Sequence, residues 1–184
     1  MKNSLLALPL GLLLGLGATS AFATTGSINF QGKITAVTCG VEIVDPVTGA
    51  PGTGAVNMGS IEASRFTATG QEYGGKGFAL RVTPGVGGCT IVPGGTATVT
   101  FTGTADASGD HYAFKPTTDA AKGVVAVIKD KSGTNVVNGS ESAEYALSDT
   151  APTDMRFDVY YRSTAAVVTP GPAEADVAFV VAIN

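Results

Sequence analysis

Apolar and polar residues alternate with a period of two through most of this chain. The alternation is clear in "FALRV" (Phe78–Val82) and in "TATVTF", where threonines separate Val99 from Phe101. Such a pattern predicts β-strands that are buried on one face. Strand-like runs also occur at 39–44, 55–61, 123–130, 134–139, 155–163 and 175–183. Because Gly, Pro, Asn and Asp residues separate the runs, the sequence predicts an all-β antiparallel sandwich, with short helical turns allowed within 60–66 and 140–145.

The last run is apolar on both faces. One face carries the larger side chains and the other carries alanines and Val180. A strand of this kind is typical of the middle of a sheet, since an exposed apolar edge promotes aggregation. We therefore expect a central position for this strand. Its larger apolar residues are Val177, Phe179, Val181 and Ile183.

A second alternating run, "GSINFQGKITAVTCG", lies at 26–40, before the first cysteine. Ile28, Phe30 and Ile34 alternate with polar residues, and Gly32 interrupts the apolar row. The pattern predicts a strand buried on one face. Alternation does not identify the partner of a strand, so an ordinary first strand of the same domain is an alternative.

The first 23 residues have the composition of a secretory signal peptide. Lys2 precedes a short apolar run, and Ala21-Phe22-Ala23 provides a signal peptidase site, which predicts cleavage before Thr24. A retained anchor helix is the alternative, but the apolar run is shorter than the roughly 20 residues that span a bilayer.

The remaining 161 residues (184 minus 23) fit one domain. Loss of Lys2 changes the formal net charge from −4 to −5, and no basic patch is present. Phosphate binding needs clustered Lys and Arg, so nucleic acid is not an expected partner. We also expect no cofactor and no metal site.

Cys39 and Cys89 are the two cysteines of the chain. An even number of cysteines after a signal peptide favours one disulfide bond, because exported proteins fold in an oxidising compartment. A two-cysteine metal site is the alternative, but the chain has no CxxC motif and no histidine nearby.

Candidate catalytic residues are few. His111 is the single histidine, within "SGDHYAF", and Asp110 or Ser108 are its possible partners. Adjacent residues of an extended chain point to opposite faces, so Asp110 is badly placed to orient the ring. The "GGKG" at 74–77 lacks the spacing of a phosphate-binding loop and is interpreted as a flexible loop. The sequence therefore predicts a surface histidine and no enzymatic activity.

Several segments, taken in order, resemble the pilin subunits of chaperone–usher fimbriae and are similar to type 1 pilus major subunits. The resemblance covers the chain from residue 26 onward. It is carried by "GSINFQGKITAVTCGV", "VNMGSI", "GFALRV" with "GGCT", "VTFTGTAD" and the C-terminal "MRFDVYYRSTAAVVTPGPAEADVAFVVAIN".

This resemblance implies an incomplete immunoglobulin-like sandwich that lacks its last strand. A donor strand from a neighbouring subunit completes such a sandwich. The implied organisation is a signal peptide at 1–23, a donor-strand extension at 24–37 and a pilin domain at 38–184. The implied donor residues are Ile28, Phe30, Gly32 and Ile34. The implied acceptor groove, which also binds the chaperone, contains Val177, Phe179, Val181 and Ile183.

The resemblance also implies a function and partners. The chain is expected to be a structural subunit of a surface fibre used in adhesion and biofilm formation. Its partners would be copies of itself or related pilins, a periplasmic chaperone and an outer-membrane usher, with contact to a host surface through the fibre. The expected location is a fimbrium on a Gram-negative cell, reached through the periplasm. A minor adaptor pilin and a self-complemented carbohydrate-binding module are the alternatives.

Two features depart from the family pattern. The penultimate residue is Ile183, where the family often has tyrosine, and the segment "DPVTGAPGTG" at 45–54 widens the spacing of the cysteines. We expect this insert to be a surface loop.

Overall fold

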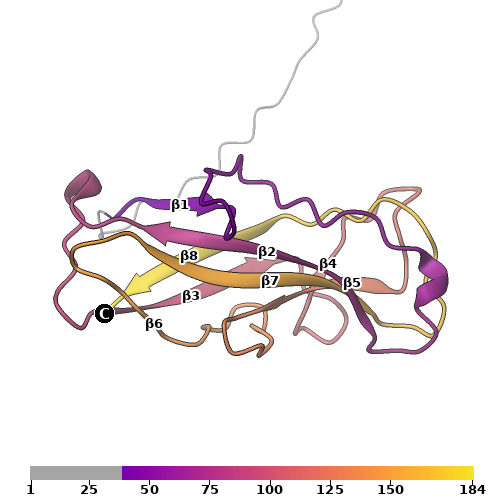
Figure 1. The fold of residues 1–184 in the computed structure, drawn as a ribbon. Helices are drawn as coiled ribbons and strands as arrows, with labels where there is room; N and C mark the ends of the chain where they lie inside the picture. The colour runs from indigo at the N-terminus through magenta and orange to yellow at the C-terminus, as the bar shows by residue number, and fades with distance from the viewer. Residues whose placement is uncertain (1–38) are drawn as a thin grey trace, which may run out of the picture. The chain divides into compact units, whose positions relative to one another are not determined.

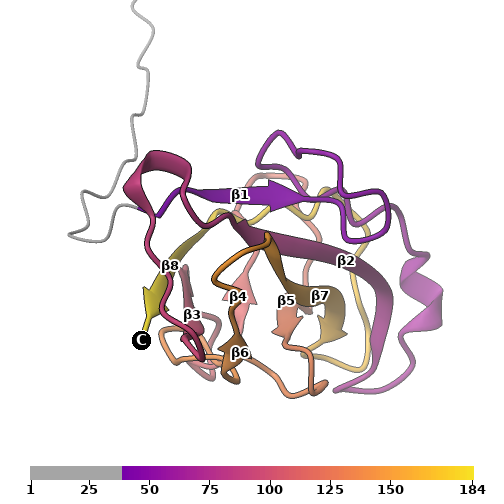
Figure 2. The same cartoon turned by 60° about the vertical axis from the view of Figure 1, so that its left-hand side comes forward.

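The computed structural model describes residues 39–184, so the predicted signal peptide and donor segment lie outside the described residues. The described chain forms two antiparallel sheets (Figures 1 and 2). The first sheet has the order β1-β2-β7-β5-β4 and the second has the order β6-β3-β8. The strands are β1 (Val41–Val44), β2 (Glu72–Val82), β3 (Thr96–Gly103), β4 (Tyr112–Ala113), β5 (Val124–Lys129), β6 (Tyr145–Ala146), β7 (Thr153–Ser163) and β8 (Val177–Ile183).

Two short 3-10 helices complete the elements, η1 (Ala63–Arg65) and η2 (Val86–Gly88). The helix η1 confirms the turn that was expected within 60–66, whereas 140–145 contains no helix. In the part of the chain that the structure describes, no helix has the length and apolar composition needed to cross a membrane. The predicted all-β class is confirmed.

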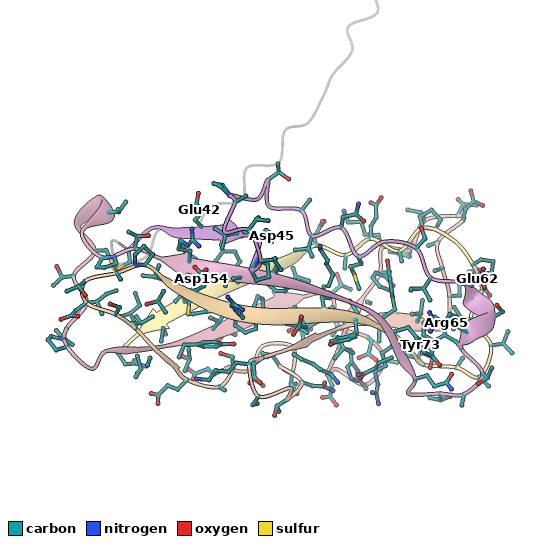
Figure 3. All side chains as sticks on the ribbon, in the orientation of Figure 1. Glu42, Asp45, Glu62, Arg65, Tyr73 and Asp154 are labelled. Carbon is teal, nitrogen blue, oxygen red and sulfur yellow. A yellow bond between two sulfur atoms is a disulfide. The ribbon has the colours of Figure 1, made fainter. Side chains whose placement is uncertain are left out.

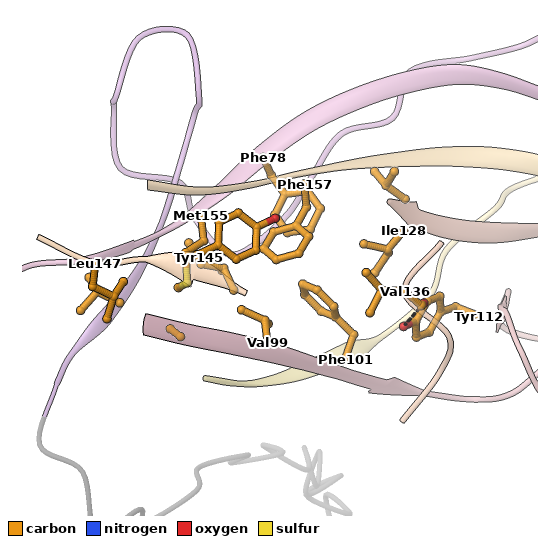
Figure 4. Close-up of a cluster of buried hydrophobic side chains, with 14 of the residues drawn as sticks. Phe78, Val99, Phe101, Tyr112, Ile128, Val136, Tyr145, Leu147, Met155 and Phe157 are labelled. Atoms are coloured by element: carbon orange, nitrogen blue, oxygen red, sulfur yellow. Dashed lines mark hydrogen bonds between the residues drawn. The ribbon is translucent and has the colours of Figure 1, made fainter. Parts of the chain in front are cut away.

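The core lies between the two sheets and is organised around three phenylalanines (Figure 4). The ring of Phe101 from β3 packs edge-on against that of Phe157 from β7, with a centroid distance of 4.9 Å. Phe78 from β2 stacks on Phe157 at 5.6 Å. These inward residues are the apolar positions of the alternating runs, so the period-two pattern correctly identified the buried face.

Two predicted strands are absent from the described residues. Residues 55–61 and 134–139 form no strand, although Asn135 makes an isolated bridge to Lys129. Conversely, the short strands β4 and β6 were not predicted, because two-residue strands are too short to show a period. Residues 74–77, which were expected to form a flexible loop, lie within a strand instead.

The glycines at 74–77 lie inside β2, at a bulge in its pairing with β7. Gly74 has a φ of +73°, a conformation that favours glycine. The aromatic ring of Tyr160 lies over Gly75, where a Cβ atom would overlap the ring. These glycines therefore allow the strand to bend beneath an aromatic side chain, and the prediction of a flexible loop was wrong.

A disulfide bond joins Cys39 to Cys89. It connects the residues just before β1 with the loop between β2 and β3, so β1 is attached covalently to its neighbours. The chain-entropy model gives a stabilisation of roughly 4 kcal/mol for a loop of this length.

The insert at 45–54 is an ordered loop that folds over the outer face of the first sheet (Figure 3). Oδ1 of Asp45 accepts hydrogen bonds from the backbone N–H groups of Val47 and Thr48, at 2.8 and 2.9 Å. Nη1 of Arg81 donates to the carbonyl of Gly49 at 3.2 Å, and the Arg81 guanidinium also pairs with Asp154. The expected surface loop is thus confirmed, but it is anchored to β2.

Candidate functional site

A cavity with a volume of about 710 Å³ lies beside β8, between the two sheets. The floor of this groove is apolar. It includes Phe78 and Leu80 of β2, Phe101 of β3 and Val159 of β7. These four side chains are themselves buried, so the groove borders the sandwich core along one side.

The first wall of the groove is β8. In the described residues β8 pairs only with β3, from Ala97↔Ile183 to Gly103↔Val177. Its other edge carries backbone N–H and C=O groups that no described strand pairs. The expectation of a central strand is therefore wrong within the described residues: β8 is an edge strand of half-buried and exposed residues, because an apolar composition does not determine the number of hydrogen-bonded neighbours.

The four residues expected in the acceptor groove all pack half-buried against the core, on the inner face of β8. Val177 and Phe179 line the cavity itself, whereas Val181 and Ile183 lie further along the strand and outside the cavity lining. All four predicted residues therefore lie on one wall of the groove, but only two of them line the cavity.

The second wall is the segment at 55–61, which follows the insert. Val56 and Met58 pack against the core and line the cavity, but no strand ladder runs along this segment. Side-chain hydrogen bonds hold this segment: Tyr161 Oη donates to the carbonyl of Gly59 at 2.9 Å, and Gly59 N–H donates to Asn57 Oδ1 at 2.9 Å. Within residues 39–184, no strand therefore lies between the two walls.

The end of the groove near η1, called here the far end, has an apolar base of its own. A second apolar cluster of Phe66, Val124 and Val168 forms its base, and Ile61 packs against this cluster. Phe66 contacts Tyr73 edge-on at 5.1 Å, and Arg65 lies over the Tyr73 ring at 4.6 Å. Figure 3 labels Arg65 and Tyr73 at this end, beside η1.

Residues just before β8 extend the first wall and were missed from the sequence. Over 173–179 half-buried and exposed residues alternate, with Ala173 and Ala175 facing inward. Their small side chains leave the far end open. The period-two alternation of "AEADVAF" was the available signal, but alanine is too weakly apolar for the pattern to be decisive.

His111 does not take part in this groove. Its Nδ1 lies 3.2 Å from Ser108 Oγ and 3.5 Å from Asp106 Oδ2. Ser108 Oγ donates to Asp106 Oδ1 at 2.7 Å, and the His111 N–H donates to the same oxygen at 3.1 Å. The carboxylate that holds this turn is therefore Asp106, which the sequence analysis did not name. No cluster of three metal-ligating side chains occurs in residues 39–184.

Comparison with known proteins identifies the family. The model of the fimbrial protein family matches residues 28–184. The chain belongs to this family. It is 32% identical over 150 residues to the K99 fimbrial protein of Escherichia coli, which covers 82% of this chain and 74% of that protein. It is 29% identical over 160 residues to the type 1 fimbrial subunit of Salmonella typhimurium, which covers 84% of this chain and 80% of that protein.

A solved chaperone–usher pilus shares the fold of this fimbrial subunit. The TM-score is 0.60 at 20% identity, and the match covers 88% of this chain and 96% of the pilus chain. The predicted family is confirmed, together with the sandwich fold and the role of a structural fimbrial subunit. The subunit is an all-β member of this family, and within residues 39–184 one edge of β8 has no paired strand. It therefore has the incomplete sandwich that the resemblance implied.

Proposed function

We propose that this fimbrial subunit polymerises by donor-strand exchange. Residues 24–37 of one copy, or of a related pilin, occupy the groove of the next copy and pair with the free edge of β8. The observation that carries the proposal is the edge of β8 that no strand of residues 39–184 pairs, beside an apolar cavity of about 710 Å³. A strand inserted there would cover the core and satisfy the backbone groups of both walls.

The composition of the donor segment supports this proposal. Ile28, Phe30 and Ile34 present one apolar face, and their burial contributes roughly 5–9 kcal/mol before ordering costs. Gly32 occupies the position at which side chains of the acceptor core already fill the groove. Because each subunit donates to the next, the contact does not close and produces a filament.

The proposed route of assembly follows from this function. A signal peptide at 1–23 directs export to the periplasm of a Gram-negative bacterium. There a chaperone covers the groove with a strand of its own, and an outer-membrane usher exchanges that strand for the donor strand of the next subunit. The product is an adhesive surface fimbrium. The subunit acts as a non-catalytic building block.

Deletion of Thr24–Ile34 tests the proposal. The shortened subunit keeps its groove, so it should still form a soluble complex with the periplasmic chaperone but should give no fibres by electron microscopy. A control with 24–34 replaced by a Gly/Ser segment of equal length separates strand chemistry from chain length, and should also give no fibres. Failure to fold even with the chaperone would favour an ordinary internal strand.

A further inference from the structure

Lys33 is the only charged residue in the proposed donor segment 24–37. It lies between Gly32 and Ile34, so on an extended strand its side chain points away from the apolar row. A donor strand whose apolar face fills the groove therefore holds Lys33 on the outer, solvent-facing side of the sheet.

The groove wall just before β8 carries two carboxylates on this same outer side. Glu174 and Asp176 are exposed, and they alternate with the half-buried Ala173, Ala175 and Val177. Both acidic residues belong to the lining of the cavity at its far end. Because directly paired strands share their inner and outer faces, Lys33 and these carboxylates lie on one face.

The charged side chains at the far end of the groove carry a net negative charge. Lys115 Nζ lies 2.8 Å from Asp176 Oδ1, and this contact raises the pKa of Lys115. Glu174 has no ion pair within residues 39–184. Its backbone is fixed by a hydrogen bond of 2.7 Å from the Lys115 N–H to the Glu174 carbonyl. One lysine and two carboxylates leave a local charge of −1, which complements a single incoming lysine.

The direction of the donor strand decides whether these charges meet. Every strand pair in the described residues is antiparallel. In an antiparallel donor whose Ile34 reaches the far end of the cavity, opposite Ala173, Lys33 lies opposite Glu174 and Phe30 lies opposite Val177. In a parallel donor whose Ile28 lies opposite Val177, Lys33 lies opposite Ala182, and β8 carries no acidic side chain. The antiparallel direction also leads the donor chain out at the far end, opposite to the start of β1 (Figure 1), which gives head-to-tail contacts.

We propose that Lys33 of one subunit forms an ion pair with Glu174 of the next, and that this pair fixes the direction and register of the donor strand. The inference rests on the donor-strand function proposed above, and it assigns a specificity role to two polar residues rather than to the apolar row. Lys33 is a positioning residue of the donor, and Glu174 is its counterpart on the acceptor.

Charge reversal tests the ion pair in complexes of the full mature chain with its periplasmic chaperone. The rate of polymer formation is measured for wild type, Lys33→Glu, Glu174→Lys and the double variant. Each single reversal should slow polymerisation about 3- to 10-fold, and the double variant should return to within about twofold of wild type. Asp149→Lys, an equal charge change at an exposed loop residue, is the matched control and should have no effect. Salt at about 0.5 M should reduce the differences.

Single variants that polymerise like the Asp149→Lys control, or a double variant that is as slow as the singles, would overturn the ion pair. Gly32→Leu, measured in parallel, separates this outcome from failure of the function itself. If Gly32→Leu blocks polymerisation and the charge variants do not slow it, the donor-strand function is supported and the proposed ion pair is rejected. If Gly32→Leu polymerises at the wild-type rate, the proposed donor-strand fit fails.

Discussion

Asp130 is the residue that organises the turn after β5. Its side chain is 5% exposed. Oδ1 accepts hydrogen bonds from Ser132 Oγ at 2.6 Å and from the Ser132 N–H at 2.9 Å, while Oδ2 accepts one from the Ala143 N–H at 3.0 Å. Burial raises the pKa of Asp130, but these hydrogen bonds outweigh it and the net pKa is lowered. The carboxylate is therefore held in its charged form.

The lowered pKa makes stability depend on pH in the acidic range. A group with a depressed folded pKa stabilises the fold above its unfolded pKa of about 4, and this contribution is lost as the pH falls through the folded pKa. We expect Asp130→Asn to lower the free energy of unfolding by about 1–3 kcal/mol at pH 7, and the difference from wild type to shrink toward pH 2. Urea unfolding at several pH values measures this. A constant difference across the range would contradict it.

At the residue level, the sequence correctly predicted a feature that depends on residue type alone. The two cysteines form the predicted disulfide. Asp130 was not singled out, because its role depends on hydrogen bonds to Ala143, thirteen residues away in the chain. Asp106, the carboxylate beside His111, was also not singled out, since the loop geometry that brings it to the ring is not visible in a sequence pattern.

Among the elements, the insert has a packing role that its composition did not indicate. Val44, at the end of β1, is 1% exposed, yet it belongs to neither core cluster. It pairs with Ala79, whose neighbours Phe78 and Leu80 face the core, so Val44 and Ala79 lie on the outer face of the sheet. A bridge between Val44 and Pro51 closes the insert over them. The insert thus holds the end of β1, just before the second wall of the groove.

This packing predicts different effects for two valines of the same region. Val44→Ala should lower the free energy of unfolding by about 2 kcal/mol, because it leaves a cavity beneath the insert. Val47→Ala is the matched control: Val47 is 90% exposed in the insert, so its change should be within about 0.5 kcal/mol. Denaturant unfolding of both variants measures this. Equal effects would show that the insert does not cover Val44.

Element-level prediction was best where alternation was strict and a paired strand was present. The run at 96–103 is β3, as the threonine and apolar alternation predicted. The run at 55–61 has the same kind of pattern but forms no strand in the described residues, because a strand needs a hydrogen-bonded neighbour as well as a suitable sequence. Apolar periodicity reports burial and cannot supply the missing partner.

On the scale of the whole molecule, the fimbrial subunit is a sandwich with one open side. Sheet edges that carry apolar residues are normally covered, because they otherwise pair with other chains. Here, within residues 39–184, the open side combines the free edge of β8, an apolar floor and a second apolar cluster at the far end. The same features that make an isolated subunit prone to association make it suited to directed association with the next subunit.

The central claim is that the missing strand is residues 24–37 of another copy. The most direct measurement is the thermal unfolding of the subunit lacking Thr24–Ile34, released from its chaperone, with and without a synthetic peptide of residues 24–37. The peptide should bind and raise the Tm by about 10 °C or more, since it buries Ile28, Phe30 and Ile34. A Gly32→Leu peptide should not. An unchanged Tm with the wild-type peptide, together with a full mature chain that is a stable monomer at high dilution, would contradict the account.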